Sequence, residues 1–176
     1  MENELFFPWV FWYSCLPKNT SKQEVTRKYQ LELVPLGTVT TIQEFASAYS
    51  YLRKPTEMKP NWNLAFFKDQ IKPMWEYFPD GGCFLQRLKR CSETNQVWED
   101  LLVECARGGL GEDVQGVMVS AKSKEVLLQV WVSQHNFAIF KQIEKALGTE
   151  GNWMFKYHSE SMRDMSTTKN ARPVNS

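Results

Sequence analysis

The chain has 176 residues, of which 43% are hydrophobic and 14% are aromatic. A chain of this length forms one domain with one core, and it buries about 70% of the surface that its unfolded form exposes. Lysine and arginine number 21 against 20 acidic residues, so a net charge of +1 gives the whole molecule almost no field for holding a long polyanion. Any contact with a nucleic acid must therefore be local.

The N-terminal segment and the cysteines exclude further classes of protein. Residues 1–16 are apolar, but Glu2, Glu4 and Pro8 favour a strand over a signal peptide. No apolar run reaches the ~20 residues that cross a bilayer, so we expect no membrane contact. The four cysteines show no C-x-x-C pairing and the two histidines stand apart from them, which disfavours a metal site. Reduced thiols indicate a cytosolic or nuclear compartment, and we expect a monomer without a cofactor.

The first half of the chain predicts four strands and one helix. Aromatic and β-branched runs indicate strands at 9–15, 29–34, 64–67 and 83–88. The helix is expected at 41–52, where a Thr-x-x-Glu capping box precedes apolar residues that share one side.

The next part predicts a second helix and a pair of strands. Segment 95–107 carries apolar residues with helical period and ends at two glycines, which commonly terminate helices. Strands are expected at 114–121 and 126–132, joined by a tight turn.

The C-terminal part predicts a third helix, a last strand and a tail. Segment 136–147 has Asn136 as its N-cap and Gly148 as its stop, and a strand is expected at 153–158. Residues 159–176 show no period and predict a mobile tail, which leaves 1–158 as the folded domain.

The arrangement of these elements indicates an α+β fold. Strands outnumber helices about two to one, and the short turn before residue 126 requires antiparallel neighbours. We therefore expect a mainly antiparallel sheet with the helices on one face. The other face is left to surround a ligand.

An indole followed at once by a carboxylate is the most informative feature of the chain. Trp75 and Glu76 lie in a segment bounded by Pro73 and by a run rich in proline and glycine. Most tryptophans belong to a core and most glutamates are simply solvated, but a large indole in a loop must cover the core or wait for a partner. A π-surface beside a two-oxygen acceptor suits a planar cation with N–H donors on its edge. A purine made positive by alkylation fits this description.

A second aromatic ring is needed to sandwich such a base. Tyr29 is preferred over Trp62 because it follows a polar stretch and lies where a loop enters a strand. Each aromatic face contributes about 0.5 to 2 kcal/mol toward a cationic ring, so two faces favour the methylated base by roughly 10- to 1,000-fold.

Phosphates attached to the base would need cationic partners. Lys122 and Lys124 stand in the turn between two predicted strands, and Arg163 and Lys169 stand in the tail. Charge-assisted contacts of this kind contribute about 1.5 to 3 kcal/mol each. Exposed lysines in turns commonly serve solubility alone, so both interpretations stay open.

Four segments, in order and spacing that cover nearly the whole chain, form a further pattern. They are W-V-F-W-Y at 9–13, F-K-D-Q-I-K-P-M-W-E at 67–76, G-V-M-V with V-W at 116–131, and S-T-T-K-N at 166–170. The P-M-W-E string and the tail motif are specific, whereas the hydrophobic strands are not. Together they resemble the eukaryotic translation initiation factor 4E family of cap-binding proteins.

The resemblance implies a fold and a ligand. The fold is a curved antiparallel sheet of about seven to eight strands backed on one face by three helices, and the ligand is the 7-methylguanosine cap of messenger RNA. The implied roles are base stacking for Tyr29 and Trp75, the guanine edge for Glu76, the N7-methyl contact for Trp131, and phosphate contacts for Lys122, Lys124 and Arg163.

The resemblance also implies protein partners, with departures that mark a divergent member. A scaffold like initiation factor 4G or a 4E-binding repressor would dock on a surface containing Ile42, Trp98 and Leu102. Ala46 replaces a tryptophan there, which disfavours an ordinary helical motif because a lost aromatic anchor costs several kcal/mol. Near the cap, tyrosine at 29 weakens one stacking face, and Cys83 stands where the family often has an arginine.

Three functions follow from these observations. The first is recognition of the cap in translation initiation or its regulation. The alternatives are a module that stacks single-stranded RNA without cap specificity, and a protein-interaction scaffold that has lost cap binding. An enzyme is disfavoured, because the chain has no nucleophile motif and the glycine run at 108–111 lacks the ending of a phosphate loop.

Overall fold

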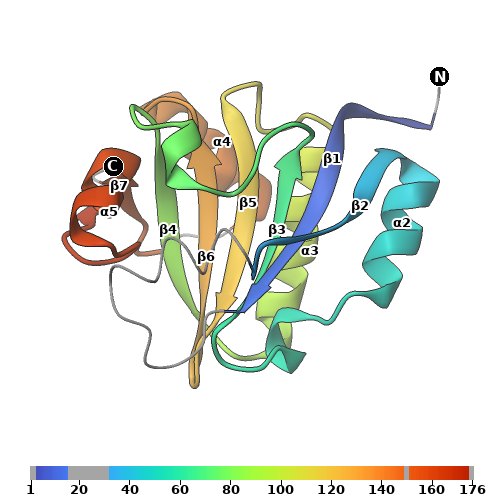
Figure 1. Cartoon of the computed structure of the whole chain (residues 1–176), viewed down its shortest axis with the longest axis horizontal. Coiled ribbons are helices and arrows are strands. Elements are labelled where there is room, and N and C mark those ends of the chain that lie inside the picture. The colour runs from blue at the N-terminus through green and yellow to red at the C-terminus, as the bar shows by residue number, and fades with distance from the viewer. Residues whose placement is uncertain (1–2, 16–31, 149–150, 175–176) are drawn as a thin grey trace.

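The computed structural model describes residues 3–15, 32–148 and 151–174. Within these residues, eight strands form one curved sheet in the order β2-β1-β3-β5-β6-β4-β7-β8, and every pair of neighbours is antiparallel (Figure 1). The strands are β1 (Glu4–Cys15), β2 (Val34–Thr41), β3 (Trp62–Lys68), β4 (Gly82–Lys89), β5 (Val114–Ala121), β6 (Glu125–Val132), β7 (Met154–Tyr157) and β8 (Arg172–Pro173).

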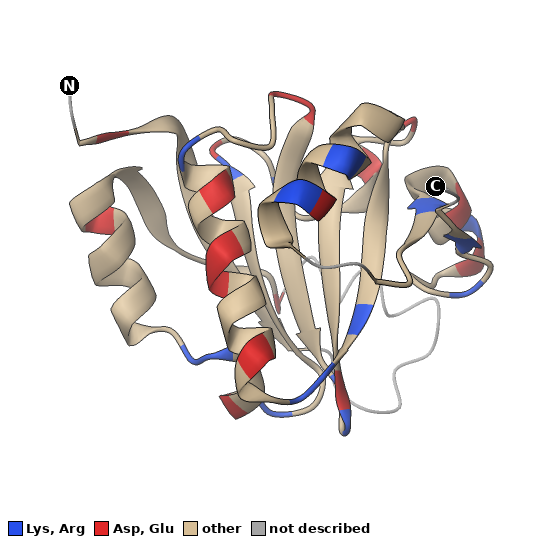
Figure 2. Ribbon diagram, turned by 180° about the vertical axis from the view of Figure 1, so that it is seen from behind, with Lys and Arg blue, Asp and Glu red and all other residues tan. Residues whose placement is uncertain are grey.

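Helices gather on one face of this sheet, as an α+β fold requires. They are α2 (Ile42–Tyr51), α3 (Ser92–Ala106) and α4 (Phe137–Leu147), with α5 (His158–Asp164) next to β7 and single 3-10 turns at η1 (Pro55–Glu57) and η2 (Trp75–Tyr77). Figures 1 and 2 show α2, α3 and α4 on the same side of the strands. The predicted fold class and the three backing helices are confirmed, and α5 was not predicted.

Local capping places two helices where the sequence predicts them. The Thr41 hydroxyl accepts a hydrogen bond from the Glu44 backbone N–H, and the Glu44 carboxylate accepts one from the Thr41 N–H, both at 3.2 Å. Helix α4 begins after Asn136, whose side chain accepts from the Ala138 N–H at 2.9 Å, and ends at Gly148 with φ of +58°. Helix α3 begins at Ser92, three residues before the predicted start, because its polar first turn has no apolar period to detect.

Strand β2 corrects the predicted strand at 29–34. Residues 29–31 lie outside the described part of the chain, Glu32 and Leu33 are not in a strand, and β2 runs from Val34 to Thr41. Its sequence V-P-L-G-T-V-T-T contains proline and glycine, which sequence patterns associate with turns. The segment is a strand because it pairs with β1 at the edge of the sheet, where proline and glycine are tolerated.

The residues beyond 158 correct the predicted tail. Through residue 174 they form helix α5 and strand β8, which pairs with β7. The segment lacks an apolar period because α5 is short and β8 has only two residues. Tertiary contacts, and not an apolar period, hold this segment against the rest of the domain.

Alternation along the strands divides the apolar side chains into two clusters. On the helix-covered face, Phe66 and Phe84 pack with Trp98 and Leu101 of α3. On the open face, a smaller cluster forms around Phe67 and contains Ala65, Cys83, Leu85, Met118, Leu127 and Trp131. All four cysteines of the chain are unpaired, and no described helix is long and apolar enough to span a bilayer. The helices therefore cover only one side, and the other side is available for a site.

Candidate functional site

A cavity of about 270 Å³ lies on the open face of the sheet. Strands β3, β4, β5 and β6 form its floor, while residues 73–76 and 165–168 stand on its sides. The predicted residues Trp75, Glu76, Trp131 and Lys122 all border this one cavity.

The Trp75–Glu76 side of the cavity depends on a compact turn. The N–H of Tyr77 donates to the Met74 carbonyl at 3.2 Å, and the N–H of Phe78 donates to the Trp75 carbonyl at 3.1 Å. Trp75 is half-buried against the open-face cluster, whereas Glu76 is exposed at the cavity edge. The turn thus presents an anchored indole and a solvated carboxylate to the same space.

Trp131 forms part of the floor and is only 3% exposed. Its Nε1 donates to the Gln129 side-chain oxygen at 3.2 Å, and the edge of Phe67 meets its ring at a centroid distance of 5.3 Å. Gly116 makes room for Phe67, because a Cβ there would lie 2.3 Å from the Phe67 ring. On the other side, the His158 ring lies 4.5 Å from Trp131. The indole therefore has a fixed orientation.

A row of polar side chains crosses the cavity floor. The Gln129 amide nitrogen donates to the Ser120 hydroxyl at 3.1 Å, and the Asn63 amide nitrogen donates to the Ser14 hydroxyl at 3.1 Å. All four side chains are buried or nearly so, and the bonds compensate their loss of water. These residues were not predicted, because single polar residues within apolar strands do not show which neighbours they meet.

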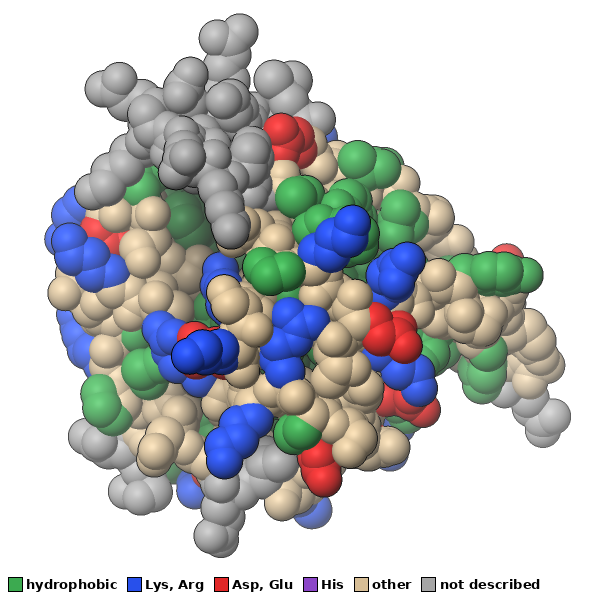
Figure 3. Space-filling view, turned by 90° about the horizontal axis from the view of Figure 1, so that it is seen from below, with side chains coloured by type: hydrophobic (Ala, Val, Ile, Leu, Met, Phe, Trp, Pro, Cys, Tyr) green, Lys and Arg blue, Asp and Glu red, His purple; other side chains and the backbone are tan. Residues whose placement is uncertain are grey.

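The cationic end of the cavity is formed by Lys122 and Arg87. Burial lowers the pKa of Lys122, the charge of Arg87 lowers it further, and Glu125 acts in the opposite direction. Arg87 also forms an ion pair with Glu125, and both line the cavity. Figure 3 shows lysine and arginine side chains gathered on the end of the molecule where the β5–β6 turn lies. The near-zero net charge thus conceals a local excess of cations suited to an anion.

Arg87 is a site residue that the sequence analysis missed. An isolated arginine in a strand is ordinarily an exposed solvent-facing residue. Its period-2 relation to Cys83 and Leu85 was the only available indication that it shares their face.

The remaining predicted ligand contacts do not border the cavity or cannot be placed. Lys124 is exposed in the β5–β6 turn and Arg163 is exposed on α5, and neither lines the cavity. Tyr29 lies outside the described residues. Its alternative, Trp62, packs edge-on against Tyr13 and also lies away from the cavity.

The predicted partner surface is only partly exposed. Ile42 is 51% exposed at the start of α2, but Trp98 and Leu102 are fully buried against the sheet. Their assignment to a docking surface is therefore wrong for this conformation, because the apolar stripe of α3 faces the core. Figure 2 shows that the outward side of α3 is rich in acidic residues, and Val103 is an exposed apolar side chain there.

Among the described residues, no group of three or more histidine, cysteine, aspartate or glutamate side chains has the arrangement of a metal site. The cavity instead offers an exposed carboxylate, aromatic surfaces, amides and cations. Such a set binds a ligand by stacking, hydrogen bonds and charge.

Comparison with known proteins identifies the family. The model of the family described as eukaryotic initiation factor 4E matches residues 4–173. Among curated relatives, the wheat (Triticum aestivum) eukaryotic translation initiation factor NCBP is 26% identical over 172 residues, covering 92% of this chain and 72% of its own length. Eukaryotic translation initiation factor 4E-4 of Caenorhabditis elegans is 26% identical over 184 residues, covering 96% of this chain and 85% of its own length.

Solved structures share the fold at lower sequence identity. Factor 4E-3 of Ascaris suum, in complex with an m2,2,7G cap, superimposes with a TM-score of 0.81 at 18% identity and covers 99% of this chain and 98% of its own. A schistosome factor 4E, in complex with m7GpppA and a 4E-binding protein, gives a TM-score of 0.80 at 20% identity and covers 96% of this chain and 93% of its own. The predicted family is thus confirmed by a match over nearly the whole sequence, and the chain belongs to the eukaryotic initiation factor 4E family.

Proposed function

We propose that this chain binds the 7-methylguanosine cap of messenger RNA and acts in translation initiation or its regulation. One observation carries the proposal: the adjacent residues Trp75 and Glu76 and the distant residue Trp131 border a single cavity. Family membership supports it, as do the cap ligands named for the schistosome and Ascaris suum structures. The family consists of initiation factors, which agrees with the prediction that the chain is not an enzyme.

Recognition of the base would combine a ring with a carboxylate. The half-buried Trp75 would stack on the guanine, and Glu76 would accept hydrogen bonds from its N1 and N2 groups. Methylation at N7 makes the base cationic, and a cation over an indole gains about 0.5 to 2 kcal/mol. Trp131, fixed by Gln129, would contact the methyl group. These contacts favour the methylated base over neutral guanine.

The phosphates of the cap would lie at the cationic end of the cavity. Lys122 and Arg87 both line it, and a phosphate would compete with Glu125 for the Arg87 guanidinium. Lys122 is an exposed residue at this end of the cavity, so its attraction to an anion should weaken as the salt concentration rises. Lys124 and Arg163, which do not line the cavity, would serve only phosphates or nucleotides beyond it. Tyr29 remains the proposed second stacking face.

A protein partner would belong to the class of 4E-binding proteins or 4G-like scaffolds. Two solved relatives support this class, since the Caenorhabditis elegans and schistosome structures are named as complexes with 4E-binding proteins. On this chain, Ile42 and Val103 offer exposed apolar contacts, while Ala46 provides no aromatic ring at its own position on α2. We propose that such a partner docks weakly here, and that the protein works as a monomer in the cytosol or nucleus.

Fluorescence titration with 7-methyl-GTP and GTP tests the proposal. The wild-type protein should bind the methylated nucleotide at least about tenfold more tightly. Trp75→Ala should weaken that binding by about 10- to 100-fold, and Glu76→Gln should do so to a similar degree by removing a charged acceptor. Uncapped oligonucleotides should bind more weakly than the cap nucleotide.

Matched controls lie in the same loop. Tyr77→Ala and Asp80→Asn alter an exposed ring and an exposed carboxylate that do not line the cavity, so both should leave the affinity unchanged. Equal binding of 7-methyl-GTP and GTP by the wild-type protein would refute the proposal. Equally tight binding of uncapped RNA would select the single-stranded RNA module instead.

A further inference from the structure

A lysine that is fully buried in strand β7 belongs to the floor of the open face. Lys156 has no exposed surface, and its backbone pairs with Cys83, which in turn pairs with Trp131 on the next strand. Directly opposed residues of antiparallel strands share a face. Lys156 therefore stands on the same rung of the sheet as Trp131, separated from it by one uncharged thiol.

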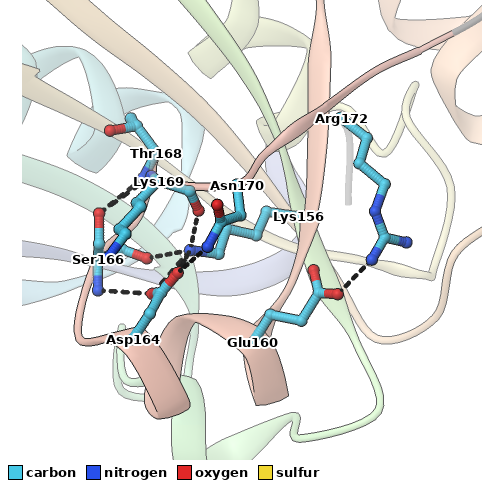
Figure 4. Close-up of polar contacts among 8 residues, drawn as sticks. All are labelled: Lys156, Glu160, Asp164, Ser166, Thr168, Lys169, Asn170 and Arg172. Atoms are coloured by element: carbon cyan, nitrogen blue, oxygen red, sulfur yellow. Dashed lines mark hydrogen bonds and ion pairs between the residues drawn. The ribbon is translucent and has the colours of Figure 1, made fainter.

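The Lys156 ammonium is surrounded by oxygen acceptors from one short segment. Its Nζ donates to both carboxylate oxygens of Asp164, at 2.8 and 2.7 Å, to the Ser166 carbonyl at 2.7 Å, and to the Lys169 carbonyl (Figure 4). Asp164 also accepts from the Ser166 N–H at 3.1 Å and from the Asn170 side chain at 3.3 Å. One buried cation thus closes residues 164–170 into a loop, and we call this set of contacts the Lys156 clamp.

The clamped loop is also a side of the cavity. Met165, Ser166, Thr167 and Thr168 all line it, as do Trp75 and Glu76. Within the loop, Met165 and Asn170 have positive φ angles of 52° and 60°. Residues other than glycine adopt this conformation infrequently, although asparagine does so more readily than most, and surrounding contacts help to hold it. The clamp contacts the chain next to both positions, through Asp164 and the Lys169 carbonyl, and acts together with hydrogen bonds from the Thr168 and Lys169 N–H groups to the Ser166 hydroxyl.

The Lys156 side chain itself is not available to a ligand. It is completely buried, and its three N–H donors are shared among four acceptors of the protein. An effect of this residue on ligand binding must therefore pass through the loop.

We infer that Lys156 is a positioning residue of the cap site, which holds residues 165–168 as a preformed wall of the cavity. The inference rests on the proposed function. Without the clamp the loop samples other conformations, and the ligand must order it on binding, which weakens affinity. The preference for the methylated base should persist, because Trp75, Glu76 and Trp131 keep their positions.

The test uses the full chain with Lys156→Met, which keeps the length of the buried side chain and removes its charge. Asp164 is 16% exposed, so its carboxylate retains access to water in this variant. Amide hydrogen exchange should accelerate at residues 164–170 in the ligand-free protein. The dissociation rate of 7-methyl-GTP, measured by stopped-flow fluorescence, should rise about tenfold while the ratio of its affinity to that of GTP stays constant.

Two further variants keep the test decisive. Lys156→Met/Asp164→Asn should match Lys156→Met alone, because the two side chains act as one unit. Arg172→Gln is the matched control: it breaks the other ion pair of this segment, with Glu160, and neither residue lines the cavity (Figure 4). The control should leave the loop exchange and the dissociation rate at their wild-type values.

Two results would overturn the inference. One is unchanged exchange at 164–170 in Lys156→Met, which would show that other contacts hold the loop. The other is faster exchange with an unchanged dissociation rate, which would show that the loop does not contribute to binding. If the wild-type protein failed to prefer 7-methyl-GTP, the proposed function would be wrong, and residues 165–168 would not form the wall of a cap site. The exchange measurement would still report whether the clamp orders the loop.

Discussion

The two faces of the sheet use the same strands for different purposes. Phe66 and Phe67 are adjacent and fully buried, yet Phe66 packs under the helices and Phe67 supports Trp131 on the open face. The helix-covered face is built from apolar side chains, whereas the open face mixes a small apolar cluster with a hydrogen-bonded polar row. The first arrangement supplies stability through buried area, and the second supplies fixed polar groups for a ligand.

The tryptophans of the helix-side core contrast with Trp131 in the cavity floor. The indole nitrogens of Trp9, Trp98 and Trp153 in that core have no hydrogen-bond partner among the described residues, and neither has that of Trp12, which packs beside the open-face cluster. The indole nitrogen of Trp131 donates to Gln129. A tryptophan under the helices thus serves as bulk, while the one in the cavity floor has its orientation specified.

Removing a large side chain from the helix-covered face should cause the largest loss of stability. Trp98→Ala deletes a fully buried indole, and we expect the free energy of unfolding to fall by about 3 to 5 kcal/mol. The preference for 7-methyl-GTP over GTP should stay at its wild-type value, because Trp98 lies in the helix-side core and does not line the cavity. Urea denaturation followed by circular dichroism and a nucleotide titration measure the two quantities. Loss of the preference in a folded variant would show that the two faces are not independent.

The second-largest effect should be a loss of stability at acidic pH, caused by His158 at the border of the open face. Burial lowers the pKa of His158 to about 4, and a hydrogen bond between its Nδ1 and the Phe78 carbonyl only partly opposes this. The unfolded chain therefore takes up the proton first, near pH 6.5, and the folded protein loses stability as the pH falls from about 6.5 to 4. The loss reaches roughly 3 kcal/mol at the lower end.

The variant His158→Gln isolates this contribution. It retains a donor for the Phe78 carbonyl and cannot be protonated, so the decline in stability over this pH range should become smaller than in the wild-type protein. Denaturation midpoints at several pH values measure the difference. An unchanged pH dependence would mean that His158 is not the responsible group.

The smallest expected effects come from a matched pair of substitutions, one on each face of the sheet. Phe66→Leu and Phe67→Leu each remove part of a buried ring on opposite faces, and each should cost about 1 to 1.5 kcal/mol of stability. Only Phe67→Leu should also weaken 7-methyl-GTP binding, by a few fold, because it removes the ring edge that supports Trp131. Equal effects of the two variants on binding would contradict the division of labour between the faces.

The features that the sequence determined by itself are local. The caps of α2 and α4 appear as predicted, because a cap depends on residues within one turn of each other. Trp75 and Glu76 border the same cavity for the same reason, and the excess of strands with the short turn before residue 126 correctly predicted an antiparallel sheet with the helices on one face.

Tertiary structure alone decided which distant side chains meet. The clamp joins Lys156 to a segment whose composition indicated a mobile tail, and the cationic end of the cavity joins Arg87 to Lys122 across strands. Trp98 resembled a partner contact in the sequence but is buried, because the orientation of α3 is set by its packing on the sheet. Sequence patterns record local periodicity, whereas ion pairs, burial and cavity walls arise from residues brought together only when the sheet assembles.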